Sequence, residues 1–165
     1  MEAEKMKTLS VLILSTLFTS LLWADHDLSA KKFLPADGGK TEIVRGEDWF
    51  SKALKISAGK DAPAMAAYRE TFPFSGAYIY KVSADIQGRG TAFIVLEFLD
   101  AGGKSIASHK IAAGEGSARF RDLKGRFDGR MWRARTAPVA VRIILGVEKD
   151  SVITFDDVEL EVDDD

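Results

Sequence analysis

The sequence contains no cysteine and only two histidines, His26 and His109, among its 165 residues. Without cysteine the chain can form no disulfide, no thiolate zinc site and no thiol nucleophile. It also lacks the cysteine that carries the lipid of a bacterial lipoprotein. Two histidines nearly exclude a catalytic triad or a multi-histidine metal site. These shortages leave few of the usual catalytic centres available.

The chain also lacks an excess of charge of either sign, since 23 Lys and Arg face 25 Asp and Glu for a net charge of −2. We therefore expect no nucleic-acid partner, because proteins that bind nucleic acids carry a basic excess. Hydrophobic residues make up 46% and charged residues 29% of the chain. That balance is typical of a globular domain and excludes wholesale disorder and a polytopic membrane protein.

Only one long stretch without charge is present, and it spans residues 8–24 behind Lys5 and Lys7. A basic start, an apolar run and small residues at its end are typical of a secretory signal peptide. We predict a signal peptide at residues 1–24, cleaved after Ala24, a secreted or periplasmic protein, and no membrane contact after cleavage. A retained membrane anchor is the alternative, although 17 residues fall short of the roughly 20 that span a bilayer. Residues 25–40 are expected to be a flexible segment.

From residue 41 onward, apolar and polar residues alternate with a period of two, which predicts strands rather than helices. The predicted strands are residues 53–57, 64–72, 78–87, 91–99, 105–112, 118–123, 131–136, 139–147 and 151–162. The one helical candidate is residues 47–54. Short strands at regular spacing favour an all-β sandwich or barrel over residues 41–162. Residues 163–165 are then a solvated acidic tail.

The alternation also predicts which side chains lie between the two sheets. Three strands contribute apolar residues at every second position, and we expect these residues in one core: Tyr80, Val82, Ala84, Ile94, Leu96, Phe98, Val141, Ile143 and Leu145. The opposite face of the first of these strands, Lys81 to Gln87, carries polar side chains and no aromatic ring.

Three stretches of the chain resemble a known family. They are residues 53–56 followed by 78–85 (Y-I-Y-K-V-S-A-D), residues 96–104 (L-E-F-L-D-A-G-G-K), and residues 138–143 followed by 155–160 (F-D-D-V-E-L). In order and spacing they resemble the galactose-binding-like jelly-roll carbohydrate-binding modules appended to bacterial cellulases and xylanases. The resemblance implies a two-sheet antiparallel jelly-roll β-sandwich that binds carbohydrate without catalysis.

Two other functions stay open on the same scaffold. One is a structural or protein-interaction domain without a sugar site, and the other, more distant, is a small glycan hydrolase or lyase. The acids Asp157, Glu159, Glu161 and Asp163 alternate in the last strand, at spacings of roughly 6.5–7 Å that overlap those of an inverting glycosidase pair. A solvated strand face is the simpler interpretation.

The resemblance also implies a structural calcium ion, because many such domains hold one with an acidic residue of the closing strand. Asp156 and Asp157 match that position, and Glu42 in the first strand is the third candidate ligand. Calcium prefers several hard oxygen ligands, which adjacent carboxylates and backbone carbonyls supply. The alternative is that one aspartate caps a turn or bulge and the other faces water.

Charge is unevenly distributed along the chain. Residues 119–142 contain eight basic and two acidic side chains with interleaved aromatic rings, whereas residues 148–165 contain nine acids and one base. Arginine forks and an indole face suit an acidic glycan. The alternative is that basic and acidic strands pair across a sheet, with about 0.2–1 kcal/mol for each exposed pair.

Trp132 and Trp49 are the aromatic candidates for ligand contact. If Trp132 lies in a strand, it shares a face with Arg130, while Arg133 and Arg135 share the other. Facing outward, the indole beside these arginines suits a uronic-acid or sulfated sugar; facing inward, it fills the core near Pro138. Trp49 either packs on the core or its edge, or contacts ligand.

Overall fold

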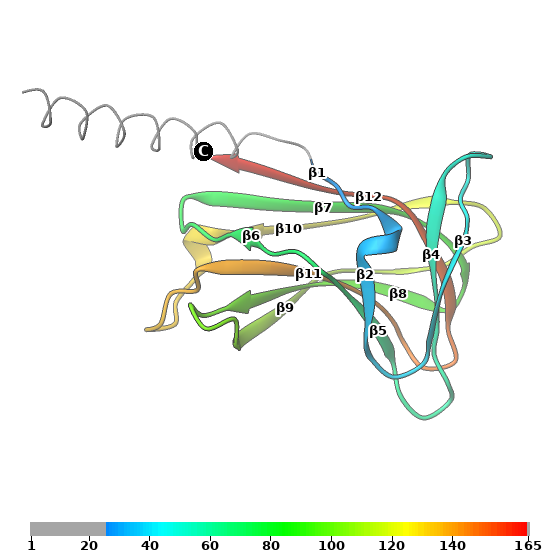
Figure 1. Ribbon diagram of the computed structural model, residues 1–165, viewed down its shortest axis with the longest axis horizontal. Coiled ribbons are helices and arrows are strands. Elements are labelled where there is room, and N and C mark those ends of the chain that lie inside the picture. Colours follow the sequence, from blue (N-terminus) through cyan, green and yellow to red (C-terminus); the bar gives the residue numbers. More distant parts are fainter. Residues whose placement is uncertain (1–25, 165) are drawn as a thin grey trace, which may run out of the picture.

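The computed structural model describes residues 26–164, which form two antiparallel sheets of six strands each. The sheets lie face to face (Figure 1), so the predicted all-β sandwich is confirmed. The predicted signal peptide and its cleavage site lie outside the described residues. No helix among residues 26–164 has the length and apolar character needed to cross a membrane.

Sheet A has the strand order β10-β7-β12-β4-β3, and β1 pairs with β12 beside β4. Its strands are β1 (His26–Asp27), β3 (Lys40–Arg45), β4 (Lys52–Ser57), β7 (Tyr78–Arg89), β10 (Arg121–Asp128) and β12 (Val152–Asp164). Sheet B has the order β2-β5-β11-β8-β9, and β6 pairs with β11. Its strands are β2 (Phe33–Asp37), β5 (Ala64–Tyr68), β6 (Phe72–Pro73), β8 (Thr91–Leu99), β9 (Ser105–Glu115) and β11 (Ala140–Val147). Two short 3₁₀ turns complete the fold, η1 (Ala30–Lys32) and η2 (Gly129–Met131).

The core lies between the two sheets and contains every residue predicted for it. The nine predicted core side chains are all at most 2% exposed. Phe155 and Leu160 of β12 add to the same cluster, and both are fully buried. Period-two alternation placed these residues correctly because successive side chains of a strand point to opposite faces.

The predicted boundaries fail around residues 118–136. A single strand, β10, spans Arg121–Asp128, and residues 131–136 hold the end of η2 and a loop. Gly125 lies within β10, opposite Val82 of β7, and a Cβ atom there would lie 2.8 Å from Cγ1 of Ile111 in β9. This glycine therefore marks a close approach of the two sheets, not the loop that the sequence predicted.

Three further segments differ from expectation. Residues 26–37 are not a flexible segment but form β1, η1 and β2, because Leu28 and Phe33 are buried in the core. Residues 47–54 form no helix: 46–51 are the loop between β3 and β4, and β4 begins at Lys52. Asp163 and Asp164 belong to β12 instead of a tail, since they pair with the start of β7.

Candidate functional site

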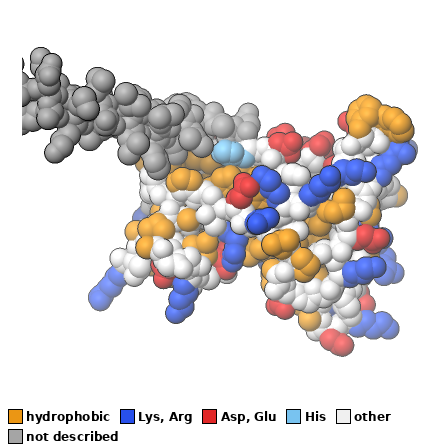
Figure 2. Space-filling view, viewed as in Figure 1, with side chains coloured by type: hydrophobic (Ala, Val, Ile, Leu, Met, Phe, Trp, Pro, Cys, Tyr) orange, Lys and Arg blue, Asp and Glu red, His pale blue; other side chains and the backbone are white. Residues whose placement is uncertain are grey.

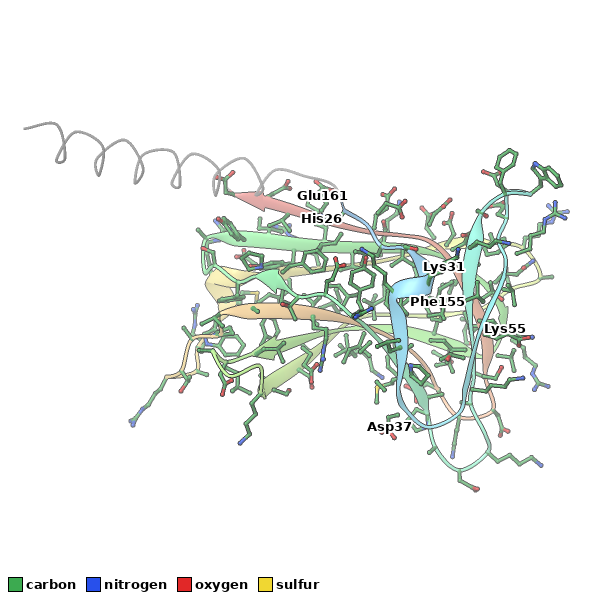
Figure 3. The ribbon with its side chains drawn as sticks, in the orientation of Figure 1. His26, Lys31, Asp37, Lys55, Phe155 and Glu161 are labelled. Atoms are coloured by element: carbon green, nitrogen blue, oxygen red, sulfur yellow. The ribbon has the colours of Figure 1, made fainter. Side chains whose placement is uncertain are left out.

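A groove of about 690 Å³ crosses the outer face of sheet A, on the side away from the core. Its polar side chains come in pairs from three neighbouring strands: Lys81 and Ser83 of β7, Lys124 and Arg126 of β10, and Glu159 and Glu161 of β12. We call it the charged groove. Figure 3 shows Glu161 on the outer side of β12, whereas Phe155 of the same strand points into the sandwich.

Antiparallel pairing sets these side chains in rows across β10, β7 and β12. The first row is Arg126–Lys81–Glu161 and the second is Lys124–Ser83–Glu159. Each row has a cation on β10 and a carboxylate on β12. The basic and acidic strands therefore do not pair directly, as one interpretation of the sequence expected, because β7 lies between them.

Two of the three cationic side chains of the groove, Lys81 and Lys124, form ion pairs with carboxylates. Nζ of Lys81 lies 2.8 Å from Oε1 of Glu161 and also contacts Asp163, and these hydrogen bonds raise the pKa of Lys81. Nζ of Lys124 lies 2.7 Å from Oδ2 of Asp122, two residues earlier on the same strand. Both ammonium groups therefore already have carboxylate partners.

Arg126 and Glu159 differ from those pairs. Within residues 26–164, neither side chain makes a hydrogen bond or an ion pair, and both are exposed. Arg126 acts only at longer range, where its charge helps to lower the pKa of Asp128 and of Asp163. The groove thus presents one guanidinium donor and one carboxylate acceptor to a ligand.

A third row continues the groove and is wholly acidic, with Asp122, Asp85 and Asp156 in register. A hollow of about 240 Å³ is lined by Asp85, Asp122 and Asp157, and it shares Ser83, Lys124 and Glu159 with the charged groove. Burial, followed by the hydrogen bond and charge of Asp122, raises the pKa of Asp85 to about 6. The two residues lie directly opposite each other on β10 and β7.

A β-bulge breaks the alternation that the sequence predicted for the acids of β12. The register with β7 shifts between Asp156 and Glu159, and Asp157 has a φ of +44°. Asp157 is therefore out of register with the alternation of Glu159, Glu161 and Asp163, although it lines the same hollow as Glu159. Burial and the nearby charge of Asp156 raise the pKa of Asp157.

Asp156 is buried, with 3% of its surface exposed, and it holds the loop at residues 46–51. Its Oδ2 accepts a hydrogen bond from the backbone N–H of Glu47 at 2.6 Å and another from Oγ of Ser51 at 3.0 Å. A carboxylate that accepts two such bonds is satisfied without a metal ion.

The three predicted calcium ligands are not brought together. Glu42 lies 3.8 Å from Nζ of Lys55, its neighbour on β4, and Asp157 is exposed. Among residues 26–164 no three acidic or histidine side chains group as a metal site. These residues do not fit the three-ligand site expected from the sequence, since calcium takes six to eight oxygens. Calcium binding itself stays a prediction.

Trp49 and Phe50 lie at the tip of that same loop and form the most exposed aromatic pair of the described residues. Their exposed fractions are 70% and 77%, and their ring centroids lie 5.8 Å apart. The guanidinium carbon of Arg45 lies 5.6 Å from the Trp49 ring. Figure 2 shows this apolar patch beyond the end of β3 and β4. The sequence analysis named Trp49 as a candidate for ligand contact but missed Phe50. Phe50 could have been found because it directly follows Trp49 in a segment where apolar and polar residues do not alternate.

Trp132 is half-buried and packs against the edge of the core. Its ring lies 5.0 Å from Phe98 and 5.8 Å from Phe74, and its Nε1 donates to the carbonyl of Thr136 at 3.1 Å. The backbone N–H of Val139, directly before β11, donates a hydrogen bond to the carbonyl of Leu99 at the end of β8. Because residues 131–136 are a loop, the predicted alternation with the arginines does not apply.

The three arginines predicted beside Trp132 do not form a site with it. Arg130 pairs with Asp128 through its side chain at 2.7 Å and holds the pKa of that carboxyl at about 2. Arg133 donates to the carbonyl of Arg130 at 2.5 Å, and Arg135 is exposed on the loop. None of them lines the charged groove.

The two-sheet sandwich also occurs in proteins of known structure. No protein-family model and no curated protein matches the chain. The tandem CBM22-1–CBM22-2 of Xyn10C from Paenibacillus barcinonensis superposes with a TM-score of 0.60 and 9% identity, over 87% of this chain and 45% of that one. The family 11 carbohydrate-binding module of Lic26A-Cel5E from Clostridium thermocellum gives 0.54 and 13%, over 84% and 95%. The chain has the fold of carbohydrate-binding modules.

The same fold also occurs inside larger proteins. The enzymatically active domain of tailspike protein 4 from bacteriophage CBA120 matches with a TM-score of 0.54 and 14% identity, over 86% of this chain. This chain spans only 19% of that tailspike domain. At such identities the comparisons establish the sandwich fold, so the function must be argued from the groove itself.

Proposed function

We propose that this domain binds a carbohydrate chain in the charged groove and holds it without cleaving it. The observation that carries the proposal is the arrangement of the groove in rows, with donors on β10 and acceptors on β12. A sugar hydroxyl both donates and accepts hydrogen bonds. A chain lying across the rows meets both kinds of partner.

The fold supports the same function. Single modules named for carbohydrate binding share it over nearly their whole length, among them a xylan-binding CBM22-1 domain of which this chain covers 92%. No aromatic side chain of residues 26–164 lines the charged groove. Recognition here therefore rests on hydrogen bonds and charge, with Trp49 and Phe50 as an additional stacking platform on the loop.

The carboxylates of the groove fit binding better than hydrolysis. Asp122, which lies directly opposite Asp85, is already paired with Nζ of Lys124 at 2.7 Å and is therefore not a free partner carboxylate for Asp85. Glu161 is held by Lys81 and is therefore not a free partner carboxylate for Glu159. We assign Glu159 the role of a hydrogen-bond acceptor.

Secretion or export to the periplasm belongs to the same proposal. It is supported by the uncharged run at residues 8–24 behind two lysines. A polysaccharide partner would then be met outside the cytoplasm. The alternative of a protein-interaction domain has one specific feature in its favour, which is the exposed pair Trp49 and Phe50.

The groove can be blocked by Ser83→Trp, because Ser83 lies at the centre of the second row. Ser108→Trp, at an exposed position on β9 of the other sheet, is the matched control. Affinity electrophoresis against a panel of neutral and acidic polysaccharides should show binding by the wild type and by Ser108→Trp, and at least tenfold weaker binding by Ser83→Trp. No binding to any polysaccharide, or equal binding by both variants, would overturn the proposal.

A further inference from the structure

Among residues 26–164, Arg126 is the one cation of the charged groove whose charge has no partner at contact distance. Its row neighbour Lys81 directs its ammonium group to the acids of β12, and Lys124 directs its own to Asp122. Arg126 makes no hydrogen bond or ion pair with any residue between 26 and 164. A guanidinium carries five N–H donors in a planar fork, and here the fork is available to a ligand.

The planar guanidinium of Arg126 has the geometry to bind a planar anionic group. It matches a carboxylate with two parallel N–H···O bonds, and such charge-assisted bonds are about twice as strong as those between neutral groups. A neutral sugar hydroxyl would leave the charge of Arg126 uncompensated. The surrounding acids Glu159 and Glu161 limit how much negative charge the groove accepts, which favours a singly charged carboxylate over a highly sulfated chain.

We propose that Arg126 binds the carboxylate of a uronic-acid residue in a glycan lying in the charged groove, while Glu159 accepts hydrogen bonds from ring hydroxyls. Arg126 belongs to the first row and Glu159 to the second, so the two groups flank the ligand diagonally from β10 and β12. The inference rests on the proposed function, since it requires that the groove hold a carbohydrate. It moves the predicted preference for acidic glycans from the loop arginines to a residue of the sheet.

The test uses oligogalacturonate and its methyl ester, which have the same backbone with and without the charge. Isothermal titration should show the wild-type chain binding the acid at least tenfold more tightly than the ester. Arg126→Gln should weaken binding of the acid by about 10-fold to 100-fold, the range expected for a lost charge-assisted hydrogen bond. Binding of the ester should change less than about twofold, and Arg126→Lys should recover only part of the loss because it lacks the fork.

Arg121→Gln is the matched control, because Arg121 lies on β10 but alternates to the opposite side from Arg126. It removes the same charge from the same strand and should leave both affinities unchanged. Equal losses in Arg121→Gln and Arg126→Gln, or equal wild-type affinity for acid and ester, would overturn the inference while leaving carbohydrate binding intact. Failure to bind any polysaccharide of the panel would instead overturn the proposed function.

Discussion

Ser51 donates a hydrogen bond from its Oγ to Oδ2 of the buried Asp156, 3.0 Å away, and so ties the β3–β4 loop to the middle of sheet A. The two residues are 105 positions apart in the sequence. The same loop carries the exposed rings of Trp49 and Phe50, so one buried carboxylate sets the position of the aromatic pair.

Asp156→Ala should lower the free energy of unfolding by about 3 kcal/mol, because it leaves the N–H of Glu47 and the hydroxyl of Ser51 without their charged acceptor. Urea denaturation followed by fluorescence would measure the loss. Asp157→Asn is the control, since Asp157 is exposed and Asn also tolerates its positive φ. It should change stability by less than about 0.5 kcal/mol. Equal losses in both variants would contradict the role given to Asp156.

Trp132→Ala should cost about 3 kcal/mol, because the indole packs against Phe74 and Phe98 at the edge of the core. Trp49→Ala removes the same side chain from a position that is 70% exposed and should shift stability by less than about 0.5 kcal/mol. Denaturation curves of the two variants give the comparison directly. A stable Trp132→Ala protein would show that this ring does not belong to the core.

Asp85 should make stability depend on pH between about 4 and 6. Its pKa is about 6 in the folded chain against an ordinary value of 3.8, so in this window the folded state holds a proton that the unfolded state releases. Stability therefore falls as the pH rises through the window. Asp85→Asn should flatten this slope and stabilise the protein at pH 7 by roughly 1 kcal/mol, after allowance for solvent screening.

The pH effect can be measured as the difference in melting temperature between variant and wild type from pH 3 to 8. Asp61→Asn, in an exposed loop, removes an equal charge and serves as the reference. The Asp85→Asn difference should grow between pH 4 and 6, and it should grow by more than the Asp61→Asn difference. Parallel curves for the two variants would mean that Asp85 titrates as an ordinary surface carboxyl.

Gly146→Ala should destabilise sheet B by about 1–3 kcal/mol through overpacking. Gly146 pairs with Phe93 of β8, and a Cβ atom would lie 2.2 Å from that ring, on which Lys110 also packs. Gly59→Ala is the control because a Cβ there meets nothing within 4 Å. Thermal melts should separate the two variants, and an unchanged melting temperature for Gly146→Ala would show that the Phe93 ring moves aside freely.

The fold class and the core could be predicted because both depend on local alternation. A strand exposes every second residue on one face, so Tyr80, Val82 and Ala84 had to share a side whatever strand paired with β7. The error at Gly125 has an equally local cause. Glycine usually signals a turn, and only the approach of Ile111 from the other sheet explains it within a strand.

The candidate site could not be predicted in the same way. The sequence determined that β7 and β12 each carry charged residues on one face, but it left residues 124–130 outside the predicted strands and did not show which strands are neighbours. Only the tertiary structure placed Arg126, Lys81 and Glu161 in one row, because strand order and register are fixed by contacts between distant segments. It also packed Trp132 against the edge of the core and left Arg126 without a hydrogen-bond or ion-pair partner among residues 26–164. Local geometry sets the face of a side chain, whereas its neighbours on that face depend on the packing of the whole sandwich.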